Sequence, residues 1–161
     1  MIYVTTCAPG KEIETVFALK KKGYTAYAPR AIRRRRRGDS TDFYAEVLFS
    51  GYIFIELPHE LRPDEYYDIR NVKTVGNFLS RTTCLSDTEA EYIRMIYGNG
   101  EAIGISKGRL ENGQLRIESG WCKKFESHIV RWSVRQHKAT VEVTLYGKPH
   151  RIICTVDIEK A

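Results

Sequence analysis

The chain has 161 residues, a net charge of +6 and 42% hydrophobic residues, enough for one domain or two small ones with a packed core. No run of roughly 18 apolar residues occurs, which excludes a transmembrane helix. Met1 leads straight into a strand pattern and not into a signal peptide, so we expect a cytoplasmic location and no membrane association. The positive charge suits a polyanionic partner, nucleic acid before membrane.

The cysteines do not form a metal-binding pattern. No two of them have the C-x-x-C spacing of a zinc site, so we expect reduced, partly buried thiols and neither a metal nor another cofactor. The four are Cys7, Cys84, Cys122 and Cys154.

The N-terminal segment predicts a strand, a helix and a second strand. Ile2–Thr6 has high β-propensity, and a helix follows over roughly Lys11–Lys22. Its apolar residues recur at helical spacing and predict one buried stripe, formed by Ile13, Val16 and Phe17. Tyr24–Ala28 reads as the next strand.

A run of arginines follows, and then the most apolar stretch of the chain. Turn residues after the run and a strand restart near Ala45 predict an exposed hairpin or loop. Val47–Leu57 predicts a strand buried on both faces, and Gly51 within it indicates a bulge or a close backbone approach. The arginines are Arg30, Arg33, Arg34, Arg35, Arg36 and Arg37.

The rest of the chain predicts two further helices and then strands alone. A helix around 64–70, a short apolar segment from Val75 and a capping box at Ser86–Glu89 complete an α+β sandwich with a mostly antiparallel sheet. Later strands are expected at 115–118, 129–134, 139–145 and 151–158, as a small β-barrel. We therefore predict a domain over 1–98, a glycine-rich linker over 99–113 and a barrel domain over 114–161.

The arginine run has two interpretations. A charge run is often a solvated face, but these arginines repel one another and no acidic block nearby cancels them. Each can bind a phosphate or stack on a base, so we interpret the run as the main nucleic-acid contact. The barrel's basic residues are dispersed enough to be ordinary surface: Lys123, Lys124, Arg131, Arg135 and Lys138.

Several motifs together resemble the NusG family of transcription elongation factors. Leu48-Phe49-Ser50-Gly51-Tyr52-Ile53-Phe54-Ile55 is similar to the family's L-F-P-G-Y-[VI]-F-[VI] strand. Pro9-Gly10-Lys11-Glu12 resembles its first helix start, and Val75 to Leu79 with Leu85-Ser86 and Glu89 resembles its V-x-x-F … L-[ST]-x-x-E passage. Gly120, Ile129-Val130 and Ala139–Val143 are similar to its KOW barrel.

The resemblance implies an N-terminal NGN domain that binds RNA polymerase and a KOW domain that contacts a ribosomal protein or a termination factor. It implies a polymerase-docking patch at Tyr3, Phe49 and Tyr52, although the alternative interpretation of these aromatic residues is that they belong to the core. It also places the arginine loop near DNA or RNA of the elongation complex. The chain departs from the family pattern at Ser50, Trp121-Cys122 and Ser127, which favours a specialised paralogue of the RfaH or LoaP kind.

No catalytic constellation is apparent, because no phosphate-binding loop occurs and the four histidines lie in different segments. We therefore expect no enzymatic activity, and the resemblance implies a transcription elongation or antitermination factor. The alternatives are a stand-alone or ribosome-associated KOW protein that binds RNA, and, third, a basic nuclease.

Overall fold

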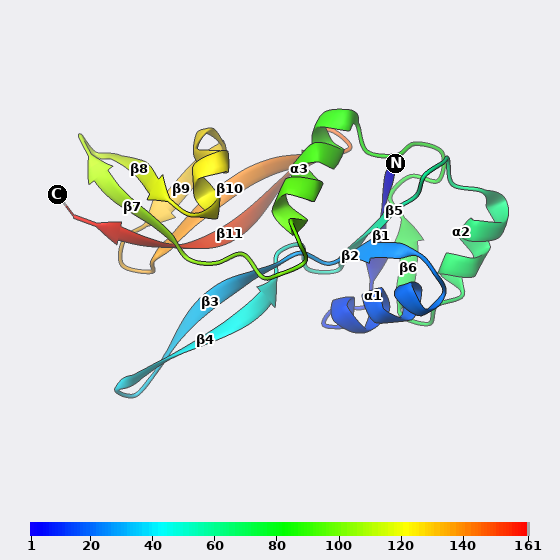
Figure 1. Cartoon of the computed structure of the whole chain (residues 1–161), viewed down its shortest axis with the longest axis horizontal. Coiled ribbons are helices and arrows are strands. Elements are labelled where there is room, and N and C mark those ends of the chain that lie inside the picture. Colours follow the sequence, from blue (N-terminus) through cyan, green and yellow to red (C-terminus); the bar gives the residue numbers. More distant parts are fainter. Residues whose placement is uncertain (161) are drawn as a thin grey trace. The chain divides into compact units, whose positions relative to one another are not determined.

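The computed structural model describes residues 1–160, and its chain divides into two compact units. Unit 1 contains residues 1–29 and 49–100, and unit 2 contains residues 30–48 and the chain from Glu101 onward. Figure 1 labels the elements of both. No helix among the described residues combines the length and the apolar composition needed to cross a membrane.

Unit 1 is built on a four-stranded antiparallel sheet in the order β2-β5-β1-β6. The strands are β1 (Ile2–Cys7), β2 (Thr25–Tyr27), β5 (Tyr52–Glu56) and β6 (Val75–Phe78), and the helices are α1 (Glu12–Lys21), α2 (Pro63–Arg70) and α3 (Asp87–Tyr97). This mixed architecture confirms the expected α+β class.

The sheet of unit 1 is buried on both faces. One face packs Tyr3 and Ile55 with Leu19 of α1 and Ile69 of α2. On the other face, Tyr27 of β2 packs against Tyr97 of α3, with ring centres 4.2 Å apart and the ring planes tilted by 32°. Burial on two sides explains why β1 and β5 are near-continuous apolar runs.

The long strand expected over 47–57 is wrong, because the chain turns within it. β4 ends at Val47 and β5 begins only at Tyr52, whose N–H donates to the carbonyl of Phe49 at 3.1 Å. Gly51 takes a φ of +80°, which a glycine adopts without strain. Its carbonyl accepts from the N–H of Cys7 at 2.9 Å, so the expected close backbone approach is confirmed.

The apolar stripe expected on the first helix is also wrong. α1 buries Glu12, Thr15 and Leu19, and leaves Ile13 and Phe17 exposed. The polar side chains are buried because each has a partner: the Glu12 carboxylate accepts from the N–H of Gly51, and Thr15 hydrogen-bonds to Thr74.

Unit 2 combines a two-stranded hairpin with a five-stranded sheet in the order β8-β7-β11-β10-β9. The hairpin is β3 (Arg30–Arg37) and β4 (Ser40–Val47). The sheet contains β7 (Ser106–Glu111), β8 (Gln114–Ser119), β9 (Ile129–Ser133), β10 (Lys138–Leu145) and β11 (Lys148–Glu159), with a 3-10 helix, η1 (Trp121–His128), between β8 and β9.

The later strands form where the sequence predicts them, and part of the segment interpreted as a linker is also a strand. β7 lies inside it, pairs antiparallel with β8 and runs parallel to β11. The segment was interpreted as a linker because it is rich in glycine and charged residues. It forms β7 because its small residues alternate with charged ones, so that Ser106 and Gly108 are buried against the sheet. The buried face of the larger sheet includes Val141 and Val156 and is joined by Phe125 of η1.

At Gly120 the chain passes so close to Ser106 that there is no room for a side chain. The φ of Gly120 is +96°, and a Cβ there would lie 2.6 Å from Oγ and 2.7 Å from Cα of Ser106. Gly113 shares the positive φ, at +77°, but a Cβ there would meet no atom within 4 Å.

We expect Gly120→Ala to lower the free energy of unfolding by about 2 kcal/mol or more, because it adds a steric clash to backbone strain. Gly113→Ala, with strain alone, is expected to cost roughly 1 kcal/mol. Denaturant unfolding of both variants measures the difference. Equal losses would show that the contact with Ser106 relaxes freely.

Candidate nucleic-acid interface

The arginine run is itself a strand. β3 pairs with β4 through eight antiparallel residue pairs, from Arg30 opposite Val47 to Arg37 opposite Ser40, around a turn at Gly38-Asp39. Side chains alternate between the two faces of a strand, and residues directly opposite share a face. The run therefore splits into two sets with different neighbours.

Arginines at odd positions share their face with carboxylates. Arg33 Nε lies 2.9 Å from Glu46 Oε2, and Arg37 Nε lies 3.2 Å from Asp42 Oδ2. Arg35, between them, places its guanidinium 5.0 Å from the ring centre of Tyr44. This face is partly neutralised by the hairpin's own residues.

Arg33 is the least accessible of these, since its side chain is only 13% exposed. Its charge reaches Cys154 of β11. Hydrogen bonding to Cys122 and burial raise the pKa of the Cys154 thiol well above its usual value, and the Arg33 charge opposes the rise. Arg33 is therefore held within unit 2, between Glu46 of the hairpin and Cys154 of the sheet.

Arginines at even positions lie on a face without hairpin carboxylates. Arg34 and Arg36 share it with Phe43, Thr41 and Ala45. Phe43 is 57% exposed, and the Arg34 guanidinium lies 5.9 Å from its ring centre. An exposed aromatic ring beside two guanidinium groups can stack a base and bind the adjacent phosphates.

The base of the hairpin is anchored to the rest of unit 2. The N–H of Ile32 donates to the carbonyl of Ile103 at 2.7 Å, and the N–H of Ile103 donates to the carbonyl of Arg30 at 2.8 Å. From β11, Thr155 Oγ1 donates to the carbonyl of Ile32 at 2.7 Å.

A side-chain ion pair adds to this anchor. Arg34 Nη2 lies 2.6 Å from Asp157 Oδ1, so one arginine of the carboxylate-free face is paired from β11. Arg36 and the rest of the hairpin tip are exposed. Arg30, at the anchored base, is half-buried and lies seven residues before the tip arginine Arg37.

The residues expected to dock polymerase do not form one exposed patch. Tyr3 is 1% exposed, and its hydroxyl oxygen accepts from the N–H of Leu61 at 3.0 Å. Phe49 is 4% exposed and meets Phe54 edge to face at 5.1 Å. Both are core residues, because the sheet of unit 1 is covered on both faces. Tyr52 is half-buried beside the Gly51 turn, and its role stays a prediction.

Sequence reasoning missed Phe43, Thr155 and Asp157. Phe43 could have been found by pairing 30–37 with 40–47 around the Gly38-Asp39 turn and reading the alternation. No local signal reveals Thr155 or Asp157, whose partners are 123 residues away in the chain. Among residues 1–160, no group of three or more His, Cys, Asp or Glu side chains is placed to hold a metal ion.

A family model described as "Transcription termination factor nusG" matches residues 2–94, which include the arginine hairpin, helices α1 and α2 and most of α3. The chain belongs to the NusG family. A search of the curated proteins found no match. In this NusG-family chain, all five strands of the C-terminal sheet lie beyond the matched residues.

The two hairpin faces predict different effects on polyanion binding. Arg34→Gln with Arg36→Gln removes the charge of Arg34, which is paired with Asp157, and the charge of Arg36, which has no carboxylate on its face, so Arg36 alone should lower the magnitude of the slope of log K against log salt by roughly 0.7 to 0.9. Arg33→Gln with Arg37→Gln removes arginines already paired with Glu46 and Asp42, so a smaller change is expected. Salt titrations with labelled DNA measure both. Equal slope losses would contradict the assignment of faces.

Proposed function

We propose that this chain is a transcription elongation or antitermination factor of the NusG type, which binds RNA polymerase through its N-terminal domain and contacts DNA or RNA through the arginine hairpin. Membership of the NusG family supports the first part. The contact with DNA or RNA is supported by the hairpin face that has no carboxylate of the hairpin itself. Arg34 and Arg36 on this face can bind phosphates, and the exposed ring of Phe43 can stack on a base.

Such a factor acts by binding alone and catalyses no reaction. A protein held on polymerase by one surface and on nucleic acid by another restrains both, because the second contact forms at a high effective concentration. We propose that this restraint suppresses pausing or termination in the cytoplasm. The exposed tip of the hairpin supports this, since a rigid two-stranded ribbon can reach a groove or a strand.

We further propose that the chain is a specialised paralogue of the RfaH or LoaP kind, with a KOW, SH3-like barrel over 114–161 that β7 and the arginine hairpin join in unit 2 and that binds a ribosomal protein or a termination factor. The strands from β8 to β11 and the departures at Trp121-Cys122 and Ser127 support this proposal.

Polymerase binding is proposed to involve Tyr52. It is the one member of the expected aromatic patch that is not buried, and it follows the Gly51 turn that the backbone of Cys7 and the carboxylate of Glu12 hold in place. A fixed aromatic side chain offers contact area at low cost in conformational entropy.

Tyr52→Ala is expected to weaken binding to core polymerase by about 2 kcal/mol, or roughly thirtyfold in Kd, with an unchanged melting temperature. Tyr67→Ala is the matched control, because it removes an exposed tyrosine from α2 in the same unit. Polymerase pull-down and biolayer interferometry measure the two. If Tyr52→Ala melts far earlier instead, Tyr52 belongs to the core.

Replacement of Arg33 to Arg37 by serine tests the division of labour. It should weaken nucleic-acid binding and flatten its salt slope, while polymerase binding survives, because the two contacts belong to different units. Unchanged affinity for DNA and RNA, with an unchanged salt slope, would refute the hairpin's role.

One observation favours a second candidate, an RNA-binding protein that acts without polymerase. The hairpin groups with the C-terminal sheet in unit 2, so its nucleic-acid contact does not require unit 1. A chain that binds RNA hairpins but is not retained by core polymerase would support this candidate over the first.

A further inference from the structure

A second cationic site lies on the sheet face that anchors the arginine hairpin. Lys138 of β10 is opposite Thr155 of β11, and Arg131 of β9 is opposite Thr140, two residues along β10 from Lys138. Opposite and alternate residues share a face, so Arg131 and Lys138 lie on the same face as Thr155. Thr155 donates its hydroxyl proton to Ile32 of the hairpin.

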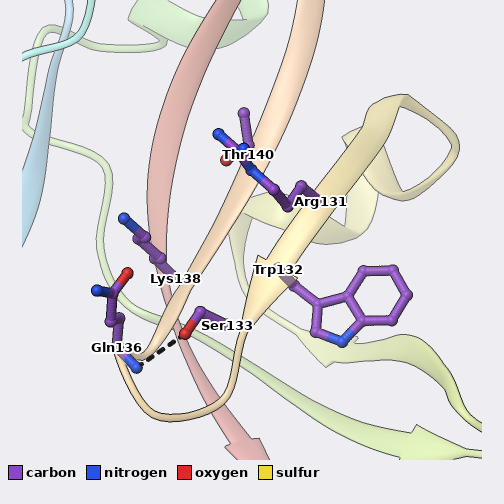
Figure 2. A pocket seen from close by; sticks show the side chains of 6 residues that line it. All are labelled: Arg131, Trp132, Ser133, Gln136, Lys138 and Thr140. Atoms are coloured by element: carbon purple, nitrogen blue, oxygen red, sulfur yellow. Dashed lines mark hydrogen bonds between the residues drawn. The ribbon is translucent and has the colours of Figure 1, made fainter.

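Arg131 and Lys138 border a pocket of about 320 Å³, whose other lining residues are Trp132, Ser133, Gln136 and Thr140. Figure 2 shows the two cationic side chains on one side of the β9–β10 ribbon and the Trp132 indole on the other. The turn between the strands is fixed by the Gln136 N–H, which donates to Ser133 Oγ at 3.2 Å. The lining contains two cations and two hydroxyl groups but no carboxylate.

Carboxylates on the same face have other partners. Glu142 Oε2 lies 3.4 Å from Arg151 Nε. Asp157 Oδ1 lies 2.6 Å from Arg34 Nη2 and 3.7 Å from His137 Nδ1. Among residues 1–160, therefore, no carboxylate is paired with Arg131 or Lys138. Two like charges on neighbouring strands repel each other, and an anion bound between them would relieve this repulsion.

We propose that this pocket binds a backbone phosphate of the nucleic-acid strand that the arginine hairpin contacts. The inference rests on the function proposed for the hairpin. The Arg131 fork can bind two phosphate oxygens, Lys138 adds a compact charge, and the Ser133 hydroxyl, which accepts from Gln136, still has its own proton to donate.

The contact is independent of sequence. Because the Trp132 ring points away from the two cations, a phosphate between Arg131 and Lys138 would meet charge and hydroxyl groups and not the indole ring. Phosphate contacts of this kind fix the register of a strand and leave base identity to other residues, here those around Phe43.

The test uses the full chain and labelled strands of roughly a dozen nucleotides, as DNA, as RNA and as a DNA duplex. For Arg131→Gln with Lys138→Gln we expect roughly tenfold weaker binding, on the scale of one charge-assisted hydrogen bond. The salt slope should fall in magnitude by roughly 1.4 on single strands or 1.8 on duplex, equally for unrelated sequences. The nucleic acid for which the salt slope falls, whether single-stranded DNA, RNA or duplex DNA, is the one that the pocket binds.

Two further variants separate the pocket from general charge. Lys124→Gln with Lys148→Gln removes the same charge from exposed positions elsewhere in unit 2, and its slope should match wild type. Arg131→Lys with Lys138→Arg keeps both charges, and its slope should also match wild type. If the two variants that lose two charges show the same fall in salt slope, the slope depends only on net charge and the proposed phosphate site is refuted.

Comparison with the hairpin variant keeps the two proposals distinguishable. If Arg34→Gln with Arg36→Gln weakens binding and the pocket variant does not, the pocket is refuted and the hairpin stands. If only the pocket variant weakens binding, the hairpin's role is refuted and the pocket stands as a separate phosphate site. Binding unchanged in both variants refutes both.

Discussion

The hydrogen bonds that anchor strand β3 are the constraint on which the candidate interface depends. A two-stranded ribbon in water is marginally stable by itself. Here Ile103 exchanges backbone hydrogen bonds with both Arg30 and Ile32, and Thr155 adds a hydroxyl donor from β11. Because β11 pairs with both β10 and β7, the anchor connects the hairpin to the interior of a five-stranded sheet.

Fixing the base of the hairpin also fixes the directions of its charges. An unstructured loop would average its arginines over all directions, whereas the paired strand assigns alternate arginines to opposite faces. Glu46 and Asp42 lie on one face, and the other keeps Arg34, Arg36 and an exposed Phe43. The ion pair from Asp157 to Arg34 then reaches across to the sheet face that carries Lys138, so two cationic sites share one scaffold.

The sequence predicts this architecture as far as local patterns extend. Helices α2 and α3 follow from Pro63 and from the Ser86–Glu89 capping box, which the structure contains. The turn residues Gly38-Asp39 located the tip of the hairpin. The strand before it was not recognised, because a run of identical arginines shows no alternation of polar and apolar residues. The Val47–Leu57 stretch hid a turn for the opposite reason, since every residue around Gly51 favours a strand.

Burial and long-range pairing were beyond sequence reasoning. Tyr3 and Phe49 were assigned to a surface because nothing local tells which face of a doubly covered sheet a partner could reach. Helix α1 buries a different face from the expected apolar one, because Glu12 and Thr15 form hydrogen bonds with residues in distant loops. Arg131 and Lys138 looked like ordinary surface until the register of β9, β10 and β11 brought them beside the hairpin's anchor.

The most direct test of the account is native-state hydrogen exchange of the Ile32 amide as denaturant is added. If β3 is part of unit 2, the protection of Ile32 should fall together with that of Val141 and Ile152 in the sheet, and Thr155→Val should lower it. Exchange at the rate of an open loop, or protection that instead follows Val4 and Phe54 of unit 1, would contradict the anchoring of the arginine hairpin to the C-terminal sheet.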